Sequence, residues 1–202
     1  LGLDNTLIPC SLRMPTEDDT SFAGYGTILA SMIMADATSG LSSNLNVIDP
    51  DEILMIISCC RVGQSFSNGY LQPTGSSFQT LCKRIRHVIG NYNAKFMGIT
   101  WSQGETDAVA GYNTNYQYIL QYFVQFLRDY IAYSSSLFDP LPTVQAQTDK
   151  IPFITFQMNQ AWVDANSALA TPVQTALIGI GNIVPYTACV NITNLPAKLR
   201  TG

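Results

Sequence analysis

The stretch that decides the fold is Gly98-Ile99-Thr100-Trp101-Ser102-Gln103-Gly104-Glu105-Thr106-Asp107, an apolar segment that runs into a Gln-Gly-Glu turn. Residues Phe96–Trp101 are mostly apolar and do not alternate strictly with polar residues, which is typical of a strand buried on both faces. In α/β sheets, ligands bind at the carboxyl ends of the parallel strands. The polar residues that follow Trp101 are therefore candidates for chemistry.

The rest of the chain shows the same alternation of apolar runs and helical patterns. Three further apolar runs predict buried strands: Ile53–Ser58, Ile151–Gln157 and Ile183–Val190. Apolar residues at helical spacing, or a cap followed by such a pattern, predict four helices: Ser21–Ala37, Phe78–Ile89, Tyr116–Ile131 and Asn166–Ile180. Strands that alternate with helices predict an α/β fold, a three-layer α/β/α sandwich with a parallel sheet.

Composition excludes several classes of partner. The 202 residues are 47% hydrophobic and 12% charged, which predicts a globular domain. Lys and Arg total 10 and Asp and Glu total 14, and no basic run is present, so we expect no nucleic-acid partner. Apolar runs such as Ile53–Cys60 are far shorter than the ~20 residues that span a bilayer, so we expect no membrane partner.

Cysteine usage gives no sign of a metal site. The five cysteines show no Cys-x-x-Cys pair and no Cys/His cluster; they are Cys10, Cys59, Cys60, Cys82 and Cys189. Structural zinc is held by such clusters. We therefore expect neither a metal nor a cofactor.

The segment Trp101–Asp107 resembles the third signature block of the sialate O-acetylesterase branch of the SGNH hydrolases, whose usual form is Trp-His-Gln-Gly-Glu-Ser-Asp. Ser102 and Thr106 depart from that form, outside its Gln-Gly-Glu centre. The resemblance implies a flavodoxin-like sandwich in which residues 1–202 form one SGNH-type esterase domain. It implies a serine esterase that removes acetyl groups from sugar hydroxyls, with acetylated carbohydrate or polysaccharide as its partner.

Two positions are candidates for stabilising an oxyanion. A glutamine just past a parallel strand, Gln103, places an amide NH₂ where the oxyanion of acyl transfer would form, and Gly104 allows a tight turn beside it. Glu105 can anchor that turn or orient an imidazole, and Asp107 can cap the next segment. The resemblance implies that Gly63, in the second block, donates its backbone N–H to the same oxyanion. The alternative is that Gln-Gly-Glu is only a polar turn after a strand.

The nucleophile and the base are harder to place. Gly63-Gln64-Ser65 can be taken as the family's first block, with Ser65 as the nucleophile, but order and spacing favour a nucleophile block before Leu1. The single histidine, His87, falls on the polar face of a predicted helix and is expected to be a surface residue. In the resembled family an Asp-x-x-His block follows the last strand, so we expect it beyond Gly202, in a longer polypeptide.

Two functions from different classes remain open. The first is the O-acetylesterase; the second is a catalytically inactive carbohydrate-binding or structural virion module of the same fold, which the single histidine favours. Low charge is compatible with a secreted or virion-surface protein such as a tail spike, and a homo-oligomer is left open. The aromatic residues of Tyr116–Tyr133 are expected to pack in the core with hydroxyls at its rim, and Trp162 is a weaker candidate for a pocket.

Overall fold

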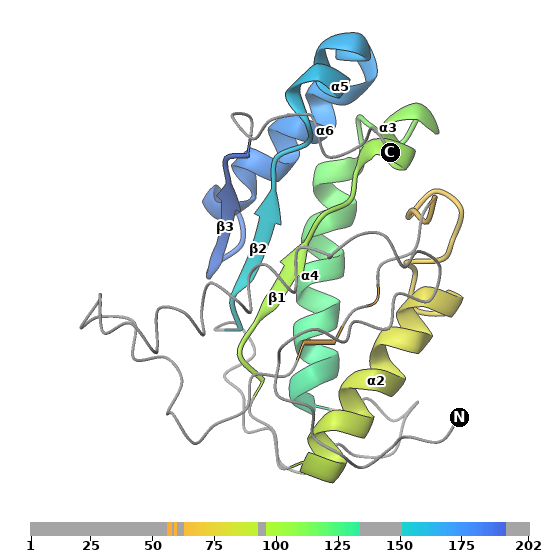
Figure 1. Ribbon diagram of the computed structural model, residues 1–202, viewed down its shortest axis with the longest axis vertical. Helices are drawn as coiled ribbons and strands as arrows, with labels where there is room; N and C mark the ends of the chain where they lie inside the picture. Colours follow the sequence, from red (N-terminus) through yellow and green to blue (C-terminus); the bar gives the residue numbers. More distant parts are fainter. Residues whose placement is uncertain (1–55, 58, 60–62, 93–95, 134–150, 193–202) are drawn as a thin grey trace, which may run out of the picture. The chain divides into compact units, whose positions relative to one another are not determined.

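The computed structural model describes residues 56–57, 59, 63–92, 96–133 and 151–192 (Figure 1). The chain divides into two compact units, Leu1–Ser58 and Cys59–Gly202. In the first unit only Ile56 and Ile57 are described, and neither belongs to a strand. The predicted helix Ser21–Ala37 and the remainder of the predicted strand at residues 53–58 lie outside the described residues.

The second unit is built on a parallel sheet with the strand order β1-β2-β3. Its strands are β1 (Ile99–Trp101), β2 (Phe153–Phe156) and β3 (Thr187–Val190). Ile99 lies opposite Phe153, and Phe153 lies opposite Thr187. The mixed α/β fold with a parallel sheet is thereby confirmed.

Each strand is shorter than its apolar run. Pro152 has no amide hydrogen, so the ladder between β1 and β2 begins at its carbonyl, which accepts from Ile99 N at 2.8 Å. Before β3, the amides of Ile183 and Val184 donate to Ile180 O and close a turn after the 3₁₀ helix η2 (Ile180–Asn182). The apolar runs extend beyond the residues that have hydrogen-bonding partners in the sheet. The predicted bounds of these strands were therefore wrong.

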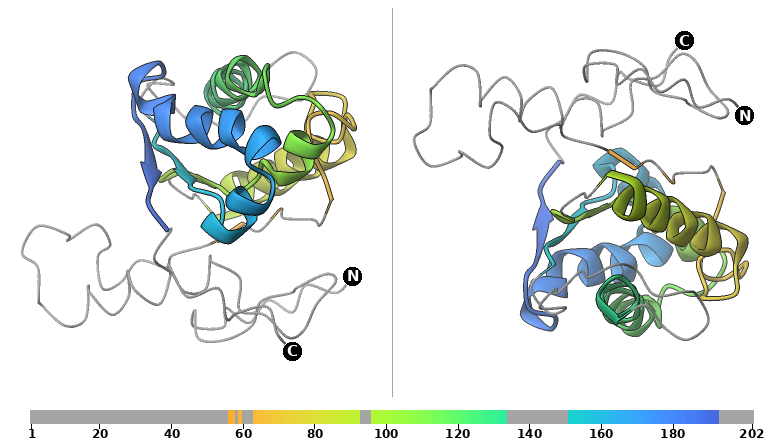
Figure 2. Two further views of the ribbon diagram at one scale, coloured as in Figure 1. Left: turned by 90° about the horizontal axis from the view of Figure 1, so that it is seen from above. Right: turned by 90° about the horizontal axis from the view of Figure 1, so that it is seen from below.

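Helices connect the strands and lie together on one side of the sheet (Figure 2). Helix α4 (Tyr116–Tyr133) leads from β1 to β2 and α6 (Ser167–Gly179) from β2 to β3, and the two helices pack against each other. Successive right-handed crossovers in one direction place both helices on the same face. A second helical layer, which a three-layer sandwich requires, stays a prediction.

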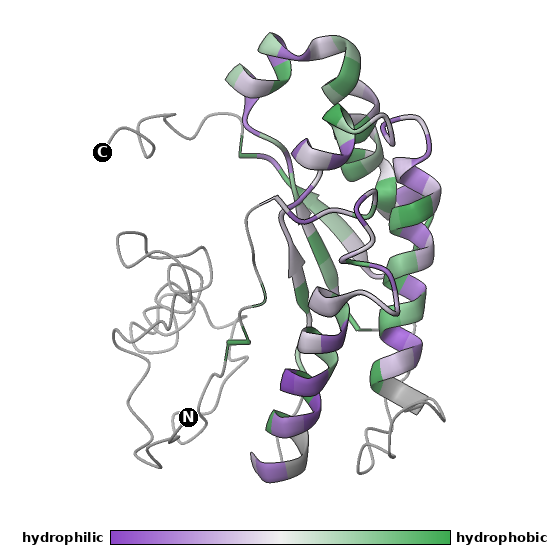
Figure 3. Ribbon diagram, turned by 90° about the vertical axis from the view of Figure 1, so that its right-hand side faces the viewer, coloured by the Kyte–Doolittle hydropathy of each residue, from purple (hydrophilic) through white to green (hydrophobic). Residues whose placement is uncertain are grey.

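Helix α2 (Ser76–Tyr92) precedes β1 and packs on α4 through aromatic rings. Phe78 contacts Phe123, Phe126 and Tyr130 with centroid distances of 6.1, 5.4 and 6.1 Å. Hydrophilic bands on α2 mark its other faces in Figure 3. The periodicity that predicted these helices is confirmed, and within the described residues no helix is both long and apolar enough to cross a membrane.

Two short helices were not predicted, and each follows the end of a strand. They are α3 (Glu105–Val109), after β1, and α5 (Gln160–Ala165), after β2. Both are shorter than two turns, too short for hydrophobic periodicity to reveal. Their positions at the carboxyl ends of strands put the residues around them in the region where α/β proteins bind ligands.

Candidate active site

The first part of the site is a turn that begins at Gly63. Gly63 is exposed and has φ 72°, a backbone conformation that favours glycine. The Asn68 side chain braces the turn, because its Oδ1 accepts from Ser65 N at 3.1 Å and its Nδ2 donates to Gly63 O at 2.9 Å. The turn that carries the Gly63 amide is therefore held by side-chain hydrogen bonds.

The fully buried carboxylate of Asp107 ties this turn to the end of β1. Its Oδ2 accepts from Phe66 N at 3.1 Å and its Oδ1 accepts from Ser67 N at 2.8 Å. Gln103 Nε2 donates to the same Oδ2 at 2.6 Å. We expected Asp107 to cap the segment that follows it, and this prediction was wrong. Asp107 lies within α3 and accepts a backbone hydrogen bond from a turn 40 residues earlier in the chain.

A buried tyrosine holds the other side of the Gln103 amide. The Tyr116 hydroxyl lies 2.8 Å from Gln103 O and 2.9 Å from Gln103 Oε1, and Trp101 Nε1 donates to it at 3.2 Å. Burial raises the pKa of Tyr116 strongly; the bond from Trp101 opposes this, and the charges of Asp107 and Glu105 add to it. The phenol therefore keeps its proton, and this hydroxyl is in the site rather than at the rim of the core.

Gly104 separates Gln103 from α3 in a space that admits no side chain. Its φ is 154°, and a Cβ there would lie 2.7 Å from Val173 Cγ1 and 3.5 Å from Met158 Sδ. Only glycine combines this conformation with so close an approach. Close packing against α6 thereby fixes the turn that delivers Gln103.

Ser65, the alternative nucleophile, is buried in the turn. Its side chain has no exposed surface, its Oγ lies 2.8 Å from Ser67 Oγ, and it accepts from Asn68 N at 3.2 Å. A serine nucleophile needs an accessible hydroxyl next to a base. These contacts fit a structural role in the turn.

Three other predicted positions lie outside this network of hydrogen bonds. Glu105 is exposed at the start of α3. His87 is exposed near the end of α2, which runs opposite to β1, so it lies toward the amino end of the strand (Figure 1). Its Nδ1 is 3.3 Å from Asn91 Nδ2. Trp162 is half-buried in α5.

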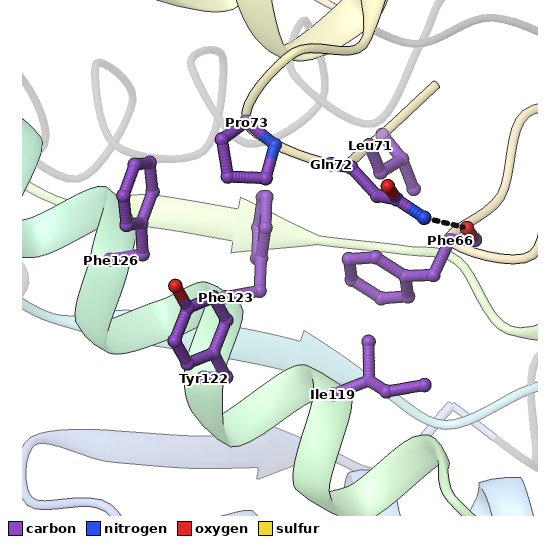
Figure 4. A pocket seen from close by; sticks show the side chains of 8 residues that line it. All are labelled: Phe66, Leu71, Gln72, Pro73, Ile119, Tyr122, Phe123 and Phe126. Carbon is purple, nitrogen blue, oxygen red and sulfur yellow. Dashed lines mark hydrogen bonds between the residues drawn. The ribbon is translucent and has the colours of Figure 1, made fainter. Parts of the chain in front are cut away.

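An apolar groove of about 220 Å³ opens beside the network, between the turn region and α4 (Figure 4). It is lined by Phe66, Leu71, Gln72, Pro73, Ile119, Tyr122, Phe123 and Phe126. Tyr118 and Tyr122 are 71% and 65% exposed, so the prediction that all aromatic residues of α4 pack in the core was wrong for these two. They are one helical turn apart and share the outer face of α4.

Sequence reasoning missed Asn68 and the role of Tyr116. The run Ser65-Phe66-Ser67-Asn68-Gly69 contains the residues that favour turns, which was a usable signal for Asn68. Tyr116 had no such signal, because an aromatic residue at the start of an amphipathic helix is normally interpreted as a core residue. Over the part of the chain that the structure describes, no three His, Cys, Asp or Glu side chains form a group that could hold a metal.

Comparison with known proteins identifies a family for the chain. No curated protein and no solved structure matches the chain. The family model described as carbohydrate esterase, sialic acid-specific acetylesterase, matches residues 37–200, which include the Gly63 turn and the Gln-Gly-Glu turn. The chain therefore belongs to the carbohydrate esterase family of sialic acid-specific acetylesterases.

Proposed function

We propose that this chain supplies the oxyanion-binding part of a carbohydrate O-acetylesterase, a serine esterase that removes acetyl groups from sugar hydroxyls. Membership of the family supports acetylesterase activity on carbohydrate. The observation that carries the proposal is the Gln103 amide, held at the end of β1 by Asp107 and Tyr116 and linked through Asp107 to the turn that begins at Gly63.

In the proposed reaction, a serine hydroxyl attacks the acetyl carbonyl and passes its proton to a base. Gln103 Nε2 and Gly63 N donate to the oxyanion of the tetrahedral intermediate, which forms where the carbonyl oxygen gains charge. The sugar oxygen then leaves with the proton from the base, and an acetyl-serine remains. Water attacks this ester by the same route and releases acetate. The donors are neutral and preorganised, so the chemistry proposed here needs no metal or cofactor.

We place the nucleophile and the base outside the 202 residues, in the flanking segments of a longer polypeptide. The burial of Ser65 and the position of His87 on the exposed side of α2 support this placement. The nucleophile block would precede residue 1 and an Asp-x-x-His block would follow residue 202. A secreted or virion-surface location, where acetylated polysaccharide is met, fits the same proposal.

The single histidine also favours a second candidate function, a module that binds carbohydrate or builds a virion without catalysis. No other residue of the chain has an imidazole. If the flanking segments also lack an Asp-x-x-His block, the fold would keep its oxyanion-binding amides without a base to activate a serine. The two functions then differ in acetate release and not in sugar binding.

The test is acetate release from an acetylated sugar by the 202-residue chain, by the longer polypeptide and by its Gln103→Ala variant. We expect no turnover by the 202-residue chain, turnover by the longer polypeptide, and a loss of about 10²- to 10³-fold in Gln103→Ala. His87→Gln in the longer polypeptide is the control and should retain turnover close to that of the unmodified protein, and Ser65→Ala, which removes a hydroxyl that braces the turn, should lose far less turnover than removal of a nucleophile does. Turnover by the 202-residue chain would assign the nucleophile to Ser65, and an inactive longer polypeptide would favour the binding module.

A further inference from the structure

We propose that Tyr116 is a positioning residue: it fixes the Gln103 amide in the one orientation that presents an N–H to substrate. The contribution to catalysis rests on the oxyanion role proposed above for Gln103. The orientation itself rests only on the hydrogen bonds of the described residues.

An amide side chain can turn by 180° and exchange its oxygen and nitrogen, so its direction depends on its neighbours. In this site Gln103 Oε1 faces a hydroxyl donor, Tyr116, at 2.9 Å. Gln103 Nε2 faces a carboxylate, Asp107, which only accepts hydrogen bonds when ionised, at 2.6 Å. The reversed amide would place Oε1 against the Asp107 oxygen with no hydrogen between them.

The direction of the Tyr116 proton follows from its own neighbours. Trp101 Nε1 can only donate, and it donates to the Tyr116 oxygen at 3.2 Å. The phenol hydrogen must therefore point to an acceptor, and both candidate acceptors, the backbone O and the Oε1, belong to Gln103. Because Tyr116 is fully buried, water does not compete for this hydrogen. The hydrogen bonds from Trp101 to Tyr116 and from Tyr116 to Gln103 therefore all run in one direction, from donor to acceptor.

This arrangement uses one hydrogen of the Gln103 amide and leaves the other. The first goes to Asp107, and among the described residues the second has no protein partner. Gln103 is half-buried and is separated from the end of β1 only by Ser102, so its second hydrogen is at the carboxyl end of the strand, where ligands bind in α/β sheets. Without the Tyr116 hydroxyl, only Asp107 and the local backbone would hold the amide.

The kinetic test replaces Tyr116 by Phe in the longer polypeptide. A misplaced oxyanion donor should lower kcat by roughly 10- to 100-fold and leave KM within about twofold, because the donor acts on the transition state. The matched control is Tyr130→Phe, which removes another buried hydroxyl of α4, one that bonds to Cys82, and should change neither constant. In a Gln103→Ala background, Tyr116→Phe should cause no further loss of kcat. A loss of the same size in both backgrounds, or none in either, would overturn the proposal.

A second readout does not depend on activity. In ¹⁵N NMR spectra, the Gln103 amide hydrogen that Asp107 accepts should exchange slowly with solvent, and nuclear Overhauser contacts should place it near the backbone amide hydrogens of Phe66 and Ser67, which donate to the same carboxylate. Tyr116→Phe should speed this exchange and weaken these contacts, whereas Tyr130→Phe should leave both unchanged. If the longer polypeptide releases no acetate, the proposed function fails and this spectrum still decides the positioning role. Resonances unaffected by Tyr116→Phe would refute that role.

Discussion

Helix α4 contributes a buried polar side chain to each of two regions of the molecule, and the two side chains differ in their hydrogen-bonding partners. At its start, Tyr116 joins the network of Gln103 and Asp107 at the carboxyl end of β1. Further along, the buried Arg128 donates through Nε and Nη2 to Ile151 O at 3.0 and 2.7 Å, and through Nη2 to Tyr186 O at 3.0 Å. These two carbonyls precede β2 and β3.

The difference separates a structural contact from one suited to chemistry. Arg128 contacts main-chain oxygens, so its hydrogen bonds clamp α4 to the starts of two strands. Gln103 is held by side chains, Asp107 and Tyr116, and keeps an amide hydrogen that no described residue accepts. Burial alone therefore does not distinguish the two regions, whereas the identity of the partners does.

The largest expected effect comes from the amino end of the sheet. Arg128→Met removes a buried cation that satisfies two carbonyls, and we expect the free energy of unfolding to fall by about 3–5 kcal/mol. Urea denaturation measures the change. Lys83→Met, on the exposed side of α2, is the control and should stay within about 0.5 kcal/mol of the unmodified protein. A loss below about 1 kcal/mol in Arg128→Met would show that the clamp contributes little.

A smaller effect is expected at the carboxyl end, from Gly104→Ala. The added methyl would lie 2.7 Å from Val173 Cγ1 and would sit on a backbone with φ 154°, so we expect a loss of about 2–4 kcal/mol. Val173→Ala removes the steric part, so the same change should cost less in that background. Thermal unfolding of the two single variants and the double variant gives the coupling. Strict additivity would show that backbone strain alone makes glycine necessary here.

The smallest effect is expected from the hydrogen bond between Cys82 and Tyr130 of α4, which lies in neither of the two regions. Burial raises the pKa of the Cys82 thiol to about 12 and, with Cys82 nearby, that of Tyr130 to about 12. Unfolding restores lower pKa values, so the native state binds more protons above pH ~9 and stability falls as pH rises toward 12. We expect a loss of about 1 kcal/mol by pH 10 that Cys82→Ala reduces. Equal pH slopes for the two proteins in urea titrations would contradict the assignment.

Local sequence was a good guide to the elements and a poor guide to the contacts between them. Periodicity of 3.6 residues located α2 and α4, because each of these helices buries one apolar face whatever covers it. The predicted strand bounds were wrong where hydrogen-bonding partners in the sheet end, because the apolar character of a segment does not indicate which strand lies beside it. Helices α3 and α5 were missed because both are shorter than two turns, too short for hydrophobic periodicity to reveal.

The sequence by itself determined the alternation of strands and helices, the parallel sheet and the family, because these follow from local periodicity and from one short motif, Trp101–Asp107. Only the tertiary structure decided that Asp107 satisfies the amides of Phe66 and Ser67, and that Tyr116 orients Gln103. These pairs join segments whose approach depends on the path of the whole chain. A hydrogen bond requires two atoms within about 3 Å, and sequence position does not encode that distance for residues tens of positions apart.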